Sequence, residues 1–330
     1  MFHKALWLKE WKQGKSMLWL LPIITFLCMG FSRMQHVLFL SENQVIMDVA
    51  RFKKEGAEMF YLFTSNSSLY ILTSFPLLLL IALTLIGSER RSLVNDFTFS
   101  MPFTRRDIYL TKWLLGAGAI VISLTLNTLI DMTVILVSPF REFFILKEHL
   151  YPLLQSSLGL IAFYSFVLMI GTIAGGTMVQ ALLSLIFCIF PIGIAVLLNG
   201  FLTINFGINL DFDIFPINLI LLTSPIVMAN MFGKLSSPLL IPIIHLLVTL
   251  GLGIFLYQRN RLENNGKVIM FPALEPVFYG GAILCFALLG GLFSAFVIEK
   301  DLFTYYAGFI SLGALAAIGS YYLRNARIPM

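Results

Sequence analysis

Charged residues are scarce in this sequence. Only 12% of its 330 residues are Asp, Glu, Lys or Arg, whereas 58% are apolar, and the mean hydropathy is +0.90. A water-soluble fold of this length does not hide so large a share of apolar side chains in its core. The composition therefore excludes an ordinary soluble protein and indicates that lipid is the main solvent of the chain.

Motifs for catalysis and nucleotide binding are also missing. The sequence has no G-x-x-x-x-G-K-[ST] phosphate-binding loop, no G-x-S-x-G and no H-E-x-x-H, the patterns of common nucleotide-hydrolysing, acyl-transfer and zinc sites. The four histidines are scattered over different regions: His3, His36, His149 and His245. We therefore expect that this chain is not an enzyme and binds no cofactor directly.

Cysteine is rare as well. The three cysteines, Cys28, Cys188 and Cys285, are odd in number and lie inside apolar runs. None has a Cys or His at the spacing of metal ligands. This pattern favours small buried apolar side chains, with neither a disulfide framework nor a metal site.

What the sequence does contain is a series of apolar runs long enough to cross a bilayer, which takes about 20 helical residues. Eight such runs lie near 17–34, 69–88, 113–137, 154–174, 179–201, 238–258, 277–297 and 304–323. Gly175–Met178 is either a tight turn between two spans or a bend in one long hairpin, so seven or nine crossings stay open. The predicted fold is an all-α integral membrane protein, a polytopic bundle of about eight transmembrane helices.

The loops between these runs differ in charge. If the runs cross the membrane in alternating directions, four segments lie on the same side: the N-terminal segment, residues 88–112, residues 259–276 and the C-terminal segment. These four segments carry most of the 22 Lys and Arg residues. Basic loops stay in the cytoplasm. The sequence thus predicts that both termini are cytoplasmic. The net charge of +5 then reflects topology and does not indicate a nucleic-acid partner.

Residues 1–16 are predicted to form an amphipathic interfacial helix on the inner leaflet. Helical spacing places Leu6, Trp7 and Trp11 on one stripe, while the lysines of this segment are free to face water or lipid phosphates. Membrane lipids are therefore expected partners. The alternative is a plain basic tail that only fixes orientation.

The loop after the second run, SERRSLVNDFTFSMPFTRRDIYLTK at residues 88–112, mixes many charges with large apolar side chains. Such side chains are unfavourable in water, so short helices against the membrane or against another protein are expected. A solvated loop that only satisfies the charge rule is the alternative.

This loop resembles the first cytoplasmic loop of the ABC-2 type permeases. Glu89 corresponds to the Glu that ends the second span, Met101-Pro102-Phe103-Thr104-Arg105 to the Pro-polar-Arg element, and Lys112 to the Lys before the third span. The resemblance implies that residues 92–108, here called the docking loop, bind a separate ABC ATPase. The residues that it marks for docking are Glu89, Leu93, Phe97, Met101, Pro102, Phe103, Arg105, Arg106 and Lys112.

The resemblance also implies partners and domains. An ATPase subunit dimer would hold ATP and magnesium, and a second permease chain, identical or paralogous, would supply the second docking loop. Residues 17–258 would form a six-span core, with an extracytoplasmic re-entrant element at residues 215–235. For that stretch, an ordinary extracytoplasmic loop with an amphipathic helix is the alternative. Residues 259–330 add a cytoplasmic loop and two further spans, which is similar to the Ytr-type bacterial permeases and implies the bacterial plasma membrane.

Three polar residues within the spans are candidates for a transport pathway. Asp131 and Asn127 lie one turn apart in the third span, and His245 lies in the sixth. Ionisable groups are unfavourable in lipid and often mark function. For Asp131, beside Asn127, the alternative is hydrogen bonding to a neighbouring helix or hydration in the outer leaflet.

Two other functions remain open. A non-transporting sensor of cell-wall stress would use the outer loop at residues 35–68, and an ion-coupled secondary transporter would need several polar groups near the membrane centre. Small residues at helical spacing, such as Gly313/Ala317, suit close helix packing within the chain or between two chains.

Overall fold

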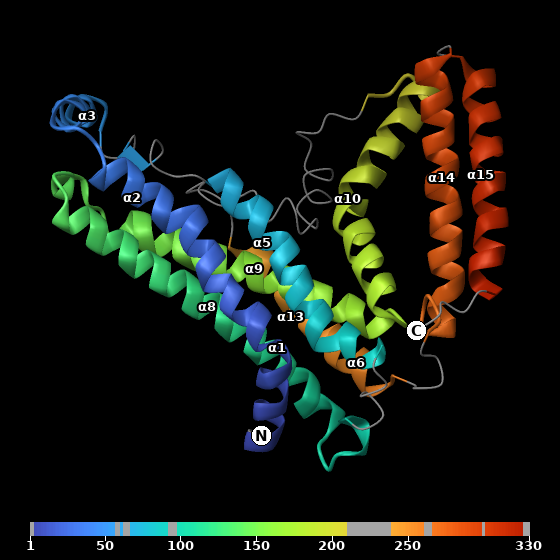
Figure 1. The fold of residues 1–330 in the computed structure, drawn as a ribbon. Helices are drawn as coiled ribbons and strands as arrows, with labels where there is room; N and C mark the ends of the chain where they lie inside the picture. The colour runs from blue at the N-terminus through green and yellow to red at the C-terminus, as the bar shows by residue number, and fades with distance from the viewer. Residues whose placement is uncertain are drawn as a thin grey trace. The chain divides into compact units, whose positions relative to one another are not determined.

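A computed structural model describes most of the chain, and its description covers residues 3–56, 60–61, 67–91, 98–209, 239–260, 266–298 and 301–325. No strand forms within these ranges, where the sole extended pairing is an isolated bridge between Ala174 and Ile269. The predicted all-α, polytopic membrane fold is confirmed (Figure 1).

The described residues form a series of helices and shorter helical turns. Their bounds are α1 (Lys4–Thr25), η1 (Phe26–Gly30), α2 (Phe31–Leu38), α3 (Glu42–Glu55), α5 (Ser67–Ala82), η2 (Leu83–Gly87), α6 (Ser88–Arg91), α8 (Arg105–Val137), η3 (Arg141–Phe143), α9 (Lys147–Ile173), α10 (Thr177–Phe206), α13 (Leu240–Gln258), η5 (Pro272–Leu274), α14 (Glu275–Val297) and α15 (Leu302–Asn325). Of these, η1 and η2 are π-helical turns, and η3 and η5 are 3₁₀ turns.

Seven helical segments in the described ranges are long and apolar enough to cross a membrane. An eighth apolar segment, Thr73–Gly87, is shorter. Together they coincide with the eight runs predicted from hydropathy. The short stretch between Ile173 and Thr177 separates α9 from α10, so of the two alternatives for it the turn between two helices is the one found.

Helix α1 passes residue 16 without a break, and the π-turn η1 continues it into α2. The segment expected to lie at the membrane surface is therefore the beginning of a longer helix, and its interfacial position stays a prediction. The buried stripe of α1 runs along residues spaced by three or four: Leu6, Glu10, Gly14, Leu18, Leu21 and Thr25. This stripe differs from the predicted one, because Trp7 and Trp11 are only half-buried.

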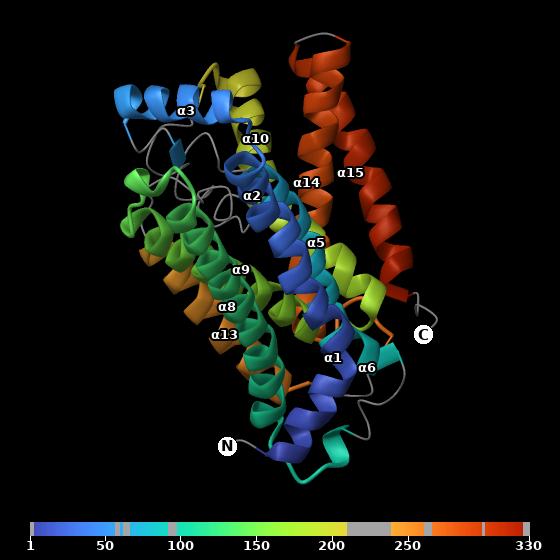
Figure 2. The same ribbon diagram turned by 60° about the vertical axis from the view of Figure 1, so that its left-hand side comes forward.

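The chain divides into two compact units, and each is described by itself. Unit 1 contains residues 1–85, 103–168 and 228–254. In it α1 and α8 run side by side in both views (Figures 1 and 2), and α5 packs against α1. Gly116 of α8 lies directly under the ring of Tyr164 of α9, where a β-carbon would collide with the ring.

Charged and polar side chains gather near both ends of α8. The basic end comprises residues 3–15, 83–85 and 103–113, and the aromatic end comprises residues 33–56, 60–61 and 131–149. Both ends belong to unit 1.

Unit 2 contains residues 86–102, 169–227 and 255–330. Its α14 and α15 form a tightly packed hairpin (Figure 1). A β-carbon on Gly290 would collide with the backbone of Gly308, and one on Gly313 would lie 3.1 Å from the β-carbon of Ala287. These small residues therefore serve packing within the chain, one of the two roles predicted for them.

Contacts within unit 2 join segments that the alternating topology places on the same side. The backbone N–H of Gly266 donates to the carbonyl of Gly175 at 2.9 Å, and the Thr177 hydroxyl donates to the carbonyl of Gly87 at 2.8 Å. Near the opposite helix ends, the Tyr306 hydroxyl donates to the Asn205 side chain at 2.8 Å. Each contact agrees with the predicted order of crossings. The domain boundary expected at residue 258 stays a prediction.

Candidate functional site

The docking loop is described only from residue 98 onward. Leu93 and Phe97, which the resemblance marked as apolar anchors, lie outside the described residues, as does the expected re-entrant element. Glu89, at the entrance to the loop on α6, is buried and 2% exposed. Along the described part, Met101 is half-buried and Pro102 is exposed.

The Pro-polar-Arg element proves to be a helix start. Thr104 is the N-cap of α8, and its hydroxyl oxygen accepts the backbone N–H of Asp107 at 3.1 Å. A Ser or Thr cap with an acidic residue three positions later satisfies the free N–H groups of a first turn. Arg105 and Arg106 are then the first two residues of the helix, half-buried and exposed respectively.

Phe103 lies just before this cap and is half-buried. Its ring is 4.7 Å from the ring of His3, measured between centroids. The contact brings the chain's N-terminal segment next to the end of the docking loop, a proximity that sequence reasoning missed.

Lys112 is fully buried, and its ammonium group forms an ion pair with Glu10 of α1. The nitrogen lies 2.6 Å from Glu10 Oε2, and both side chains are 0% exposed. The same nitrogen donates to the carbonyl of Leu85 at 2.6 Å. Lys9 binds the other oxygen of Glu10 at 2.9 Å. Glu10 was not predicted, although an acidic residue four positions from Leu6 and Gly14 on a helical stripe is a readable signal.

The two carbonyls accepting at this point belong to the π-turn η2. The side-chain amide of Gln13 donates to the carbonyl of Thr84 at 2.8 Å, while Lys112 reaches Leu85. A π-turn interrupts the regular α-helical hydrogen bonds, so its carbonyls are available to side chains. The basic end thus joins α1, the end of α5 and the start of α8 through polar contacts.

Asn127 is buried and hydrogen-bonded between helices. Its amide nitrogen donates to the Thr25 hydroxyl of α1 at 2.7 Å and to the carbonyl of Ser123 at 2.8 Å. Asn127 therefore bonds to a neighbouring helix.

Asp131 forms an ion pair with Arg33 at the aromatic end and also lies close to the ring of His149. Arg33 Nε lies 3.0 Å from one carboxylate oxygen, and His149 Nε2 lies 3.2 Å from the other. The Arg33 guanidinium also lies over the rings of Phe60 and Tyr61, at 6.0 and 5.5 Å from their centroids. Neither Arg33 nor His149 was predicted as a partner of Asp131.

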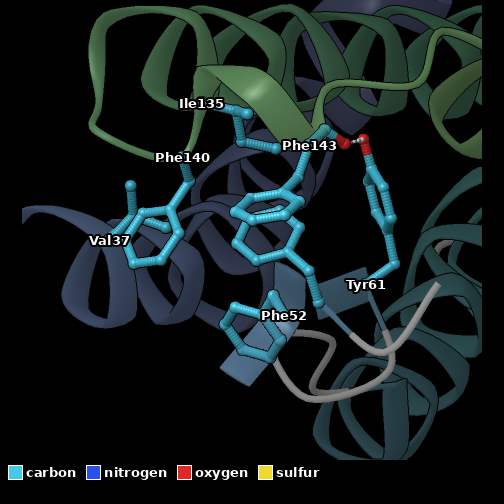
Figure 3. Close-up of a cluster of buried hydrophobic side chains, with 7 residues drawn as sticks. Val37, Phe52, Tyr61, Ile135, Phe140 and Phe143 are labelled. Atoms are coloured by element: carbon cyan, nitrogen blue, oxygen red, sulfur yellow. Dashed lines mark hydrogen bonds between the residues drawn. The ribbon is translucent and has the colours of Figure 1, made fainter. Parts of the chain in front are cut away.

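Figure 3 shows a buried aromatic cluster, which borders these charges through Phe60 and Tyr61. Its members come from two stretches that are distant in the sequence: Val37, Phe52, Phe60 and Tyr61 from the first, and Ile135, Phe140 and Phe143 from the second. Rings meet edge-to-face or stacked at centroid distances such as 5.5 Å for Phe52 and Phe60, geometries that favour aromatic pairs. The loop predicted at residues 35–68 thus contributes described residues to a packed core.

Tyr61 links this cluster to the beginning of α9. Its hydroxyl donates to the carbonyl of Phe143 at 3.2 Å, as drawn in Figure 3, and accepts the N–H of Ile145 at 2.8 Å. Burial raises the pKa of the Tyr61 phenol above its usual value.

His245 of α13 packs beside Phe166, with 5.9 Å between ring centroids. Its Nε2 atom is buried and has no hydrogen-bond partner among the described residues. The three polar residues expected within the spans are therefore not brought together: Asn127 binds Thr25, Asp131 binds Arg33 and His149, and His245 stands apart. Over the ranges that the structure describes, no three His, Cys, Asp or Glu side chains cluster as metal ligands.

Comparison with known proteins finds two relatives in Bacillus subtilis (strain 168). The chain is 27% identical to the probable ABC transporter permease YtrC over 256 residues, which cover 71% of this chain and 70% of that protein. It is 27% identical to the probable ABC transporter permease YtrD over 245 residues, covering 72% of each. No protein-family model matches the chain, and no solved structure matches it significantly. Over about seven-tenths of its length, the chain is thus similar to proteins named as probable ABC transporter permeases.

Proposed function

We propose that this chain is the transmembrane permease subunit of an ATP-binding cassette transporter of the ABC-2 type. Two copies, or one copy and a paralogue, form the translocation pathway, and a separate ATPase dimer binds ATP and magnesium. The observation that carries the proposal is the similarity to two probable ABC transporter permeases over about seven-tenths of the chain. The spans and the missing phosphate-binding loop agree with it.

The proposed orientation places both termini and the docking loop in the cytoplasm of a bacterium. A cysteine introduced at Lys53 of α3, which is exposed, should react with an impermeant maleimide added to intact cells. Tags at Met1 and Met330 should be protected. A C-terminal tag accessible from outside would contradict the even number of crossings.

The start of α8 supports a docking role for residues 92–108. The N-terminus of a helix carries partial positive charge, so Arg105 and Arg106 in the first turn are unfavourable for the helix itself. An acidic partner would offset this repulsion. The neighbouring Pro102 and Phe103 add apolar surface, and aromatic side chains flanked by arginines are frequent anchors of protein interfaces.

Co-purification with the ATPase tests the docking surface. The ATPase is one that carries a phosphate-binding loop and is encoded beside this chain, and both proteins are expressed together and isolated in detergent. Phe103→Ala should weaken association about five- to a hundredfold, the range for loss of an interface anchor.

Arg106→Glu should also impair association, and more at low salt than at high salt, because rim contacts are screened. An acidic residue in the first turn favours the helix, so unfolding of α8 would not explain the loss. Arg141→Glu is the matched control, since Arg141 is an exposed arginine on η3, beyond the opposite end of α8. If ATPase recovery is unchanged with both loop variants, the docking surface lies instead in residues 259–276.

A membrane sensor is the second candidate, and the aromatic end favours it. The outer segment packs as a core with the end of α8, which offers a rigid surface to an extracytoplasmic partner. Isolation of the wild-type chain with such a partner, and without any ATPase, would select this function. An ion-coupled transporter is less favoured because the carboxylate of Asp131 already has two partners.

A further inference from the structure

The buried ion pair at the basic end closes the base of the docking loop. Leu85 stands three residues before α6, where the chain leaves for the loop, and Lys112 stands two turns into α8, where the chain has returned. The ammonium group of Lys112 bridges these two points by donating to the Leu85 carbonyl at 2.6 Å. One side chain thus connects the segment that enters the loop with the segment that leaves it.

This connection between Lys112 and Leu85 depends on Glu10. A lysine at 0% exposure needs a counter-charge, and the Glu10 carboxylate supplies it at 2.6 Å from another helix. Lys9, whose side chain is 22% exposed, binds the second carboxylate oxygen and connects the pair to the surface. The Lys112 side chain is therefore fixed in the position from which it reaches Leu85.

Stability alone does not require charges at this point. Buried ion pairs are often replaced by apolar side chains of similar volume with no loss of stability, because desolvation offsets the attraction. What an apolar pair cannot do is donate a hydrogen bond to the carbonyl of a π-turn. The charged pair is thus suited to fixing the geometry of η2, and π-turns are frequent at functional sites.

We propose that Lys112, held by Glu10, is a positioning residue of the docking loop, and that its bond to Leu85 sets how the loop is presented to the partner. This inference rests on the proposed docking function. Through the pair, the position of the loop depends on α1, the end of α5 and the start of α8. Disturbing it loosens the loop without touching the docking surface itself.

The first experiment needs no ATPase. Inside-out vesicles containing the full chain with a C-terminal tag are treated with trypsin, which cleaves after the arginines in and just before the docking loop, at positions 90, 91, 105 and 106. The double variant Glu10→Leu/Lys112→Met removes the pair but keeps volume and apolar packing. Its loop should be cleaved roughly fivefold faster or more, because a local opening becomes easier.

Two further variants separate positioning from general stability. Asp131→Asn weakens the ion pair at the aromatic end of the same helix, so its loop should be cleaved at the wild-type rate. The exchange Glu10→Lys/Lys112→Glu restores opposite charges, but a carboxylate at position 112 cannot donate to Leu85. Its loop should stay as easily cleaved as in the double apolar variant, whereas wild-type protection in the exchange variant would overturn the proposal.

The second readout is affinity for the ATPase, measured with both proteins in lipid nanodiscs. Glu10→Leu/Lys112→Met should bind roughly five- to tenfold more weakly, since a loosened loop loses its preorganisation, while Asp131→Asn binds as wild type. Equal cleavage and equal affinity for wild type and the double apolar variant would overturn this inference and leave the docking function intact. A wild-type chain that never binds the ATPase would instead overturn the docking function, and the vesicle experiment would still decide whether the pair closes the loop.

Discussion

The two ends of unit 1 bury charged groups in different settings. At the basic end, Lys112 and Glu10 are completely buried, and the lysine also binds a backbone carbonyl of η2. At the aromatic end, the Arg33 and Asp131 side chains keep 12% and 19% of their surface exposed. There the charges border a cluster of packed rings.

This difference in burial indicates which part of unit 1 each charged pair stabilises. The basic-end pair connects α1, η2 and the start of α8, so its loss should affect the adjoining docking loop. The aromatic-end pair is attached to a core that stays packed through its rings. Removing a charge there should lower stability locally and leave the loop unchanged.

The largest expected effect is that of Lys112→Met alone. It leaves the Glu10 carboxylate buried without its principal partner, which should lower the free energy of unfolding by about 3–5 kcal/mol. Tryptophan fluorescence during chemical denaturation in detergent reports this directly, because all four tryptophans, Trp7, Trp11, Trp19 and Trp113, lie on α1 or α8.

The double variant Glu10→Leu/Lys112→Met is the control for this measurement. It removes both charges and should recover most of the lost stability. A double variant as unstable as the single one would show that the pair itself, and not an orphaned charge, stabilises the basic end.

A second prediction concerns the aromatic end. Phe52→Ala removes a buried ring that meets Phe60, Phe140 and Phe143 edge-to-face, and should cost about 3–5 kcal/mol. Because the loss is local, trypsin cleavage of the docking loop should not change. Ile46→Ala on the same helix is the control, since Ile46 is 67% exposed and its truncation should cost less than about 0.5 kcal/mol. Equal effects of the two changes would mean that α3 is not part of the core.

Hydropathy predicted the spans well, whereas the pairings of charges were not predictable from it. The fifth run, expected at residues 179–201, is α10 at Thr177–Phe206, because transfer of apolar side chains into lipid determines where such helices lie. Lys112 and Glu10 are 102 positions apart. Several charges share that end of the topology, and nothing local in the sequence selects one partner among them.

The aromatic end shows the same limit. Asp131 was recognised as an unusual residue, but its partners Arg33 and His149 come from opposite sides in the sequence. The start of α8 is the contrary case: Thr104 and Asp107 form a local capping pattern that a sequence does display. Contacts within one helical turn can thus be predicted from the sequence, whereas contacts between residues far apart in the sequence cannot.

A third prediction is that Asp131→Asn destabilises unit 1 by about 1–3 kcal/mol, the contribution of a hydrogen bond to a charged group. Denaturation measured by tryptophan fluorescence gives the value, and Glu142→Gln provides the comparison. Glu142 pairs with Lys53 on the surface, with side chains 67% and 56% exposed, and such pairs contribute about 0–1 kcal/mol. If Asp131→Asn lowers the free energy of unfolding no more than Glu142→Gln does, the packed pair contributes no more stability than the surface pair.

The smallest and most specific effect is expected for Tyr61→Phe. The change keeps the ring in the aromatic cluster but removes the hydroxyl that binds Phe143 and Ile145, which should cost about 1 kcal/mol at neutral pH. Burial raises the pKa of the Tyr61 phenol, so the folded state favours the neutral, protonated form. The associated stability is complete below the unfolded-state pKa of about 10 and is lost as the pH rises from there through the higher folded-state pKa. Wild type should therefore lose its advantage over Tyr61→Phe when denaturation is repeated above pH 10, and a difference that stays constant between pH 8 and pH 11 would show that the phenol is not held neutral by the core.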